Sequence, residues 1–523
     1  MISKLLSYKN KIFIIILFLF SIIINQFYGY RGAFPIDSFL HFDSAYRILN
    51  GENSFSDFWT VSGPAIDYIQ AIFFYILGIS WSSYVFHASL FNALLTITTF
   101  FVLKEFKLKT NFCFLYAFLF SILAYPTSGT PFVDHHSAFF SLMGIYSLLL
   151  AINNKKKIYW ILIPIFLGLA FLSKQVPAAY IILSTSFVLV FYSLKNKKFE
   201  YLKYCFVSSI AFIIFILIFG NFQGIKISSF IDQYILYPQT IGAERFENFN
   251  FTFRGVIGHF KFIYLSLIPI LFIYIKKNIG RKRQAYDDEN FSLLILILFT
   301  FSLILHQLLT KNQTFIFFLI PLLTAFSHIS LNNIKFKFKR LSYIVIIFIC
   351  VFAAIKYHLR FNEGRKFHEM SHVNFDLAVK AEKIDKKLSR LNWITPEFSE
   401  KPNEEVMIIN EIKTYLNDDN RIKMLITNYK FFSAILDEKL FSPSWAFTDD
   451  GTTHPVKNNK YTKEYRDLMI KIIKKNKIQV IYIAGTLDNR HIYNYIDKQC
   501  FNEIKIFENL KSYELKNCND INN

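Results

Sequence analysis

Acidic, histidine and arginine residues gather in the segment 37–47, DSFLHFDSAYR, shortly after an apolar run. The spacing predicts a helix with Asp37, His41 and Ser44 on one face. A carboxylate here can take a proton from a hydroxyl group, and His41 and Asp43 can bind a substrate. A solvated helix beside a membrane, with no chemistry, is the alternative interpretation.

A second candidate site lies in GTPFVDHH, residues 129–136. An acid and two imidazoles can hold a divalent metal ion or hydrogen-bond a polar substrate. Asp134 and His135 are the candidate metal ligands. Because adjacent histidines on a helix point about a quarter-turn apart, metal binding and substrate binding both stay open.

Two cations are candidates for binding an anion. Lys174 is the one basic residue of a short hairpin, 171–177, where it can contact a phosphate or reach the lipid headgroups. Arg245 follows in the segment 234–245. It can clamp a phosphate with two hydrogen bonds, or simply pair with Glu244 or Glu247.

These residues lie between long apolar runs. The chain has 523 residues, is 53% hydrophobic and holds 62 Phe against 17 Gly, which is more apolar surface than a soluble domain needs. Runs long enough to cross a bilayer are predicted at 11–26, 83–103, 111–127, 137–153, 158–173, 177–194, 204–220, 261–276, 291–309, 315–331 and 341–358.

The basic residues orient these crossings. The segments 1–11, 104–110, 153–157, 195–203, 276–290 and 332–340 hold 22 Lys and Arg in 56 residues, whereas the opposite loops hold 8 in 114. The first set is therefore predicted to be cytoplasmic, and the long loops 29–82 and 221–261 lie outside. This pattern, rather than binding of nucleic acid, accounts for the net charge of +20.

One short apolar run, 63–79, carries Asp67 and Gln70. If it crossed the membrane, nearly every lysine cluster would move to the wrong side. It is predicted to lie in, or dip into, the outer interface.

From residue 359 the sequence becomes mixed and charged, which predicts a small α/β domain, 359–523, outside the cytoplasm after a membrane domain, 1–358. Strands are predicted at 421–427 and 478–484, and helices at 375–391, 403–416 and 461–476. The stretch 442–459 is a surface loop or a binding loop. In an oxidising compartment Cys500 and Cys518 can pair.

Several motifs of the first 190 residues resemble one family in order, spacing and sidedness. Asp37, Gly51, Phe58-Trp59 and Gly63-Pro64 before an apolar helix resemble the first outer loop of GT-C superfamily glycosyltransferases. That group includes protein O-mannosyltransferases, aminoarabinose transferases and lipopolysaccharide-core glycosyltransferases. Val133-Asp134-His135 resembles its second acidic motif, and the segment 168–174 resembles the glycine-to-lysine span that follows.

Two positions depart from the family pattern. Ser38 stands where a second acid usually follows the first Asp, which weakens a metal site built on shared carboxylates. Ser62-Gly63-Pro64 stands where some members have Lys-Pro-Pro, which leaves the lipid phosphate to another cation.

The resemblance implies an α-helical polytopic membrane protein with about eleven transmembrane helices, outer juxtamembrane helices and a C-terminal α/β domain. It implies inverting transfer of a sugar from a polyprenyl-phosphate-linked donor to a glycan, lipid or protein acceptor, on the outer face of the inner (plasma) membrane. Asp37 takes the position of the catalytic base. The expected substrate-binding residues are Asp43, His41, Asp134, His135, Lys174 and Arg245.

Two other functions share this architecture. A transporter or flippase of lipid-linked sugars would more often show related halves, and no internal repeat is evident in the sequence. A polysaccharide ligase or polymerase would use the same compartment and lipid carrier with different outer loops.

Overall fold

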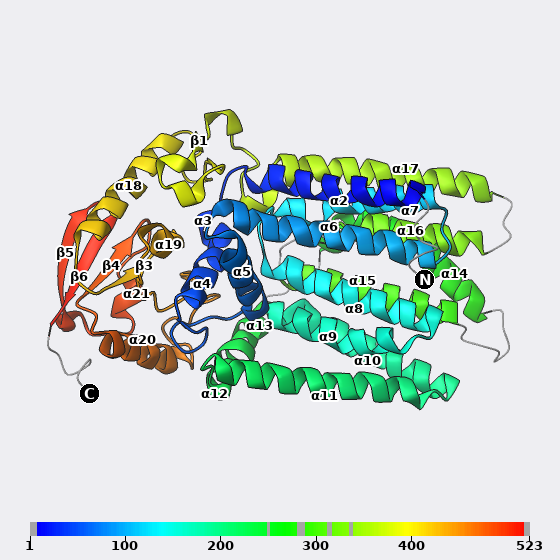
Figure 1. Ribbon diagram of the computed structural model, residues 1–523, viewed down its shortest axis with the longest axis horizontal. Coiled ribbons are helices and arrows are strands. Elements are labelled where there is room, and N and C mark those ends of the chain that lie inside the picture. Colours follow the sequence, from blue (N-terminus) through cyan, green and yellow to red (C-terminus); the bar gives the residue numbers. More distant parts are fainter. Residues whose placement is uncertain (1–7, 248–251, 280–287, 311–315, 334–337, 517–523) are drawn as a thin grey trace. The chain divides into compact units, whose positions relative to one another are not determined.

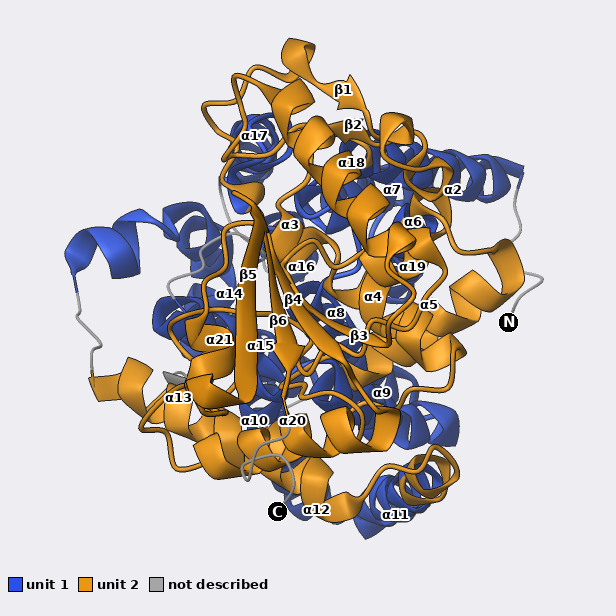
Figure 2. Cartoon of the chain, turned by 90° about the vertical axis from the view of Figure 1, so that its left-hand side faces the viewer, with its two compact units in different colours: residues 1–29, 85–216, 248–367 blue, residues 30–84, 217–247, 368–523 orange. Residues whose placement is uncertain are grey.

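The computed structural model describes residues 8–247, 252–279, 288–310, 316–333 and 338–516. The chain forms two compact units (Figure 2). Unit 1 comprises residues 1–29, 85–216 and 248–367, and unit 2 comprises 30–84, 217–247 and 368–523. The predicted domain division at residues 358 and 359 stays a prediction. The grouping of two outer loops with the C-terminal residues was not expected from the sequence.

Unit 1 is a bundle of long helices that run side by side (Figure 1). Two of them, α6 and α11, continue into unit 2 at one end. The helices are α2 (Tyr8–Gly29), α6 (Trp81–Glu105), α7 (Thr110–Leu123), α8 (Val133–Asn154), α9 (Lys157–Ser173), α10 (Gln175–Asn196), α11 (Phe199–Phe222), α14 (Lys261–Ile279), α15 (Asp288–Thr310), α16 (Leu319–Asn332) and α17 (Lys339–Tyr357).

Each predicted crossing coincides with one of these helices. Among the described residues, eight helices are long and apolar enough to span a membrane. The helices α9 and α16 are apolar but shorter, with 17 and 14 residues. These findings confirm the predicted polytopic helical membrane fold. The predicted cytoplasmic segments 276–290 and 332–340, and the outer loops 221–261 and 310–314, lie partly outside the described residues.

The run 63–79 contains a helix too short to cross a bilayer by itself. Helix α5 (Pro64–Leu77) has 14 residues, or about 21 Å of helix, against about 30 Å of hydrocarbon. Pro64 begins it, and Gly78, with a φ of 84°, ends it. One face is buried, with Asp67 and Gln70, whereas Tyr75 and Ile76 are exposed. That division suits the predicted interfacial helix.

Unit 2 is built around a four-stranded sheet in the order β3-β4-β6-β5. Strands β3 (Lys423–Ile426) and β4 (Val480–Ala484) are parallel, and β4 pairs antiparallel with β6 (Leu510–Leu515), which pairs antiparallel with β5 (Phe501–Phe507). Apolar residues of α20 (Thr462–Asn476) share a core with alternate residues of β3 and β4. On the other face, the ring of Tyr415 in α18 (Pro402–Asp418) lies 5.9 Å from that of Tyr482 in β4.

The first outer loop is part of this unit. The backbone N–H of Ala33 donates to the carbonyl of Ile394 at 3.0 Å, and that of Trp445 donates to the carbonyl of Trp59 at 3.0 Å. The remaining helices of unit 2 and the ribbon β1–β2 come from this loop, from residues 217–247 and from the C-terminal stretch. These elements are α3 (Pro35–Ser38), α4 (Leu40–Leu49), α12 (Ile227–Phe230), α13 (Tyr237–Glu247), β1 (Val379–Lys380), β2 (Asn392–Trp393), α19 (Phe432–Leu436) and α21 (Arg490–Tyr493).

The predicted strands and the helices at 403–416 and 461–476 are confirmed, but the helix predicted at 375–391 is wrong. Short 3₁₀ turns and strand β1 occupy that segment. The side chains of Asn374 and Asp385 accept hydrogen bonds from the backbone N–H groups of Asp376 and Lys387. Such turns compete with helix formation. Cys500 is disulfide-bonded, and its predicted partner Cys518 lies outside the described residues.

Candidate functional site

In unit 1 the second acidic motif and the predicted lysine come together. Asp134 lies in the first turn of α8, and Lys174 lies at the break between α9 and α10. The ammonium of Lys174 donates to Oδ2 of Asp134 at 2.6 Å, and Nε2 of His306 lies 2.7 Å from Oδ1. Asp134 is 5% exposed, whereas the Lys174 side chain is 23% exposed. The ion pair with Asp134 therefore holds the ammonium of Lys174 in one place, and its side chain is only partly buried.

The turn before α8 is fixed by buried polar side chains, which position Asp134. The guanidinium of Arg365 is 1% exposed and donates to the carbonyls of Pro126, Thr127 and Ser128 at 3.0–3.3 Å. Gly129 has a φ of 74°, and a Cβ there would lie 2.7 Å from the backbone of Gly29. The turn therefore needs glycine at this position.

Three histidines are buried near the start of α8. Nε2 of His136 lies 3.0 Å from Nε2 of His87, and Nδ1 of His136 hydrogen-bonds the hydroxyl of Tyr125. His135 stacks on the ring of Tyr125, with the ring centroids 5.0 Å apart. Across the described part of the chain, no three His, Cys, Asp or Glu side chains are arranged to hold a metal ion. Metal ligation by Asp134 and His135 stays a prediction.

In unit 2 the predicted helix through residues 37–47 is broken. Helix α3 ends at Ser38, and α4 begins at Leu40 after Phe39, whose φ and ψ are −111° and 2°. Asp37 therefore does not share one helical face with His41 and Ser44, contrary to the spacing argument. Ser38, where the family usually has an acid, accepts a hydrogen bond from the N–H of Phe34 at 2.9 Å.

His41 is held by the acid of the short apolar helix. Its Nδ1 lies 2.6 Å from Oδ1 of Asp67, and both side chains are fully buried. This contact joins α4 to α5. It fixes the orientation of the imidazole, as carboxylates do for histidines in many sites.

Asp43 lies in a buried charged cluster. Arg47 donates to Oε2 of Glu52 at 2.6 Å through Nη2, and its Nη1 lies 4.0 Å from Oδ2 of Asp43. Burial raises the pKa of Asp43, although the charges of Arg47 and Lys430 oppose this. Burial also lowers the pKa of Lys430 to about 7. Asp43 is 3% exposed, so the contacts support an orienting role.

Arg245 lies in α13 and is exposed. Burial alone would raise the pKa of Asp450, but hydrogen bonds from Thr452 and Thr448 and the positive charge of Arg245 hold it below its ordinary value. Arg245 is thus an exposed cation whose positive charge acts on Asp450.

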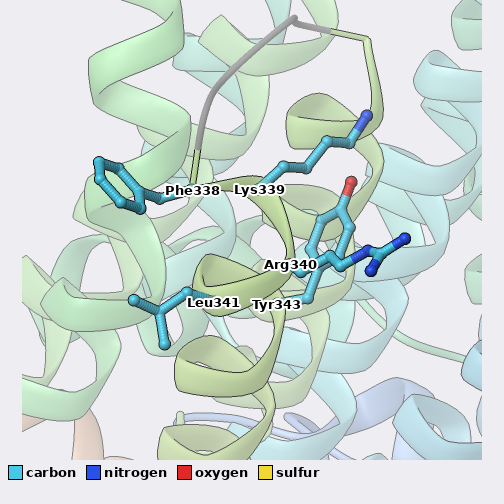
Figure 3. Close-up of a pocket in the computed structure, with 5 residues that line it drawn as sticks. All are labelled: Phe338, Lys339, Arg340, Leu341 and Tyr343. Carbon is cyan, nitrogen blue, oxygen red and sulfur yellow. The ribbon is translucent and has the colours of Figure 1, made fainter.

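A hollow of about 540 Å³ lies at the start of α17, in the segment predicted to face the cytoplasm. Figure 3 shows Lys339, Arg340 and Tyr343 on one side of the helix and Phe338 and Leu341 on the other. This arrangement suits a helix end at a membrane interface. It adds nothing to a site on the outer face.

Residues 61–219 match the model of the family described as dolichyl-phosphate-mannose-protein mannosyltransferase. This confirms the predicted resemblance to the GT-C superfamily. The match covers less than a third of the chain and indicates a membrane glycosyltransferase of the GT-C type. No curated protein matches the sequence.

The GT-C match includes Asp67, Asp134, His135 and Lys174 but not Asp37, His41, Asp43 or Arg245. Sequence reasoning missed three residues. His306 had a signal, because an ionisable side chain within an apolar span is expensive. Lys430 and Arg365 had no such signal in the sequence, since their partners come from distant segments of the chain.

Proposed function

We propose that the protein transfers a sugar from a polyprenyl-phosphate-linked donor to an acceptor on the outer face of the inner (plasma) membrane, with inversion at the anomeric carbon. The family match supports a GT-C glycosyltransferase, and the lysine distribution supports the sidedness. Residues 359–523 then lie outside the cytoplasm.

Asp37 is the proposed base. The observation that carries this choice is its partial exposure on the single-turn helix α3, begun by Pro35. Three other acids of the loop, Asp43, Glu52 and Asp67, are buried, with exposures of 3%, 6% and 0%, so an acceptor would reach them less readily. A base must come within hydrogen-bond reach of the acceptor hydroxyl, which a half-buried carboxylate can do.

The leaving group is a lipid phosphate, whose charge needs a cation. Lys174 can supply one, because an ammonium has three donors and only one is directed at Asp134. Asp134 would then position Lys174. Arg245 is the second proposed phosphate contact, through its exposed guanidinium.

Transfer from a labelled polyprenyl-phosphate sugar, by full-length protein in sealed proteoliposomes, tests the proposal. Asp37→Asn should reduce turnover on the order of a hundredfold, the scale of a lost general base, without reducing membrane insertion. Asp376→Asn, an exposed acid of the same unit, is the matched control. Near-normal transfer by Asp37→Asn would exclude Asp37 as the base. Movement of the label across the bilayer with the sugar–phosphate bond intact would instead indicate a flippase.

A further inference from the structure

A cavity of about 180 Å³ lies within unit 2, at the carboxyl ends of its two parallel strands. Asn428 and Tyr429 follow β3, and residues 484–487 end and follow β4. In open sheets of helices and parallel strands, ligands bind in the crevice beyond these strand ends. The cavity therefore has the position of a ligand site.

The polar side chains of the cavity are two acids, three hydroxyl groups and the amide of Asn428. Glu405 is 1% exposed and accepts hydrogen bonds from Trp393 and Thr395 at 2.8 Å and from Tyr429 at 2.9 Å. Glu397 and Thr486 are exposed at the rim. The lining includes no Lys, Arg or His. The charged groups of the lining are therefore both carboxylates, which disfavour an anionic ligand and can accept hydrogen bonds from hydroxyl groups.

The remaining wall is apolar and partly aromatic. Phe34, Pro35, Pro396, Tyr429 and Leu487 contribute to it. Aromatic faces and a few acceptors suit a ligand with both C–H and O–H groups on a compact ring. The volume equals that of about six liquid waters, which is room for one small ring rather than a chain.

The cavity wall leads directly into the proposed base. Residues 34–36 line the cavity, and Asp37 is the next residue of α3. Backbone hydrogen bonds from Gly32 to Asn392 and from Ala33 to Ile394, both 3.0 Å, hold this segment beside residues 395–397. A ligand in the cavity thus contacts the same short helix that carries Asp37.

We propose that this cavity binds a neutral sugar ring of the acceptor. The inference rests on the proposed function, because it makes the acceptor a saccharide. Ring C–H groups lie against Phe34 and Tyr429, and hydroxyl groups donate to Glu397 and to the acceptors around Glu405. The C-terminal residues thereby select the acceptor and present it to α3.

Binding can be measured without catalysis. Saturation-transfer difference NMR on the full chain in nanodiscs, with no donor present, would use glucose, mannose and galactose as probes and glucuronate as the anionic comparison. At least one neutral sugar should give a saturation-transfer signal. Thr486→Trp, which fills the rim of the cavity, should reduce that signal severalfold. Thr414→Trp, on an exposed face of α18 beside a different hollow, is the control.

The outcomes separate the two proposals. Sugar binding that Thr486→Trp abolishes, in a protein that transfers nothing, supports the cavity and refutes the proposed function. Active transfer with an acceptor KM unchanged in Thr486→Trp refutes the cavity. The proposed sugar binding in the cavity is also refuted if no neutral sugar gives a signal, or if glucuronate binds as strongly as the neutral sugars.

Discussion

Glu405→Gln should make unit 2 more stable at high pH than the wild type. The carboxyl is almost fully buried, and its three hydrogen-bond donors, from Trp393, Thr395 and Tyr429, are neutral. Burial raises its pKa to about 7 in spite of those hydrogen bonds. Glutamine has nearly the same shape, keeps one carbonyl acceptor and offers an N–H where the protonated acid has an O–H.

The sign and size of this difference in stability follow from the pKa of Glu405 in the folded and in the unfolded chain. The unfolded acid has a pKa of 4.5 and the folded acid one of about 7, so the folded state holds the extra proton between these values. The contribution of Glu405 to the stability of unit 2 is therefore fully present below pH 4.5 and is lost as the pH rises through 7. At about 1.4 kcal/mol per pKa unit, the loss is about 3 kcal/mol, which Glu405→Gln avoids.

Thermal unfolding followed by tryptophan fluorescence is the assay, because Trp59, Trp81, Trp393 and Trp445 lie in unit 2 and Trp160 alone lies in unit 1. The variant should melt several degrees above the wild type at pH 8 and together with it near pH 5. Glu411→Gln, on the exposed face of α18, should match the wild type at both values. A difference that does not change with pH, or one that grows towards pH 5, would refute the reasoning.

Three further predictions follow from the contacts. Lys174→Ala should raise the apparent KM for the polyprenyl-phosphate donor more than it alters acceptor preference, and unchanged donor kinetics would make Lys174 structural. Arg365→Lys cannot reach the three carbonyls of residues 126–128, so unit 1 should lose about 2 kcal/mol or more and melt earlier; an unchanged melting curve would contradict the clamp. Cysteines introduced at Ser56, Ser228 and Ser399 should react with an impermeant reagent in intact cells, and those at Asn154 and Asn333 only after lysis; labelling of Ser399 only after lysis would overturn the sidedness.

The membrane helices were predictable because a span needs a run of apolar residues that is visible locally. The strands β3 and β4 were predictable for the same reason, since both are short, buried apolar runs. The hairpin β5–β6 was missed: its residues 502–505 are exposed, so no apolar run marks it.

The site was less predictable, because its contacts depend on tertiary structure. The pairing of Asp134 with Lys174 joins residues 40 positions apart, and both had been singled out by their types. Helical spacing wrongly placed Asp37 with His41, because the break at Phe39 leaves no mark in the residue pattern. The contact between His41 and Asp67 requires the folding of α5 against α4, which a list of spacings does not contain.

The composition of unit 2 from three separated stretches has a consequence for biosynthesis. The first stretch ends at residue 84, so 439 residues (523 − 84) remain to be made before the unit is complete. At about 5–20 residues per second, translation takes roughly 20 to 90 s. For most of that time Ala33 and Trp59 lack their backbone partners from the C-terminal stretch, and Asp43 lacks Lys430.

The first outer loop must therefore persist without these partners while most of the remaining chain is made. A chain cut between residues 368 and 392 keeps the eight spans of the described residues, yet it leaves Ala33 and Trp59 of this loop without their backbone partners. Truncated chains should accordingly be inserted in the membrane and then be cleaved by cellular proteases within residues 30–60, far from the site of the truncation.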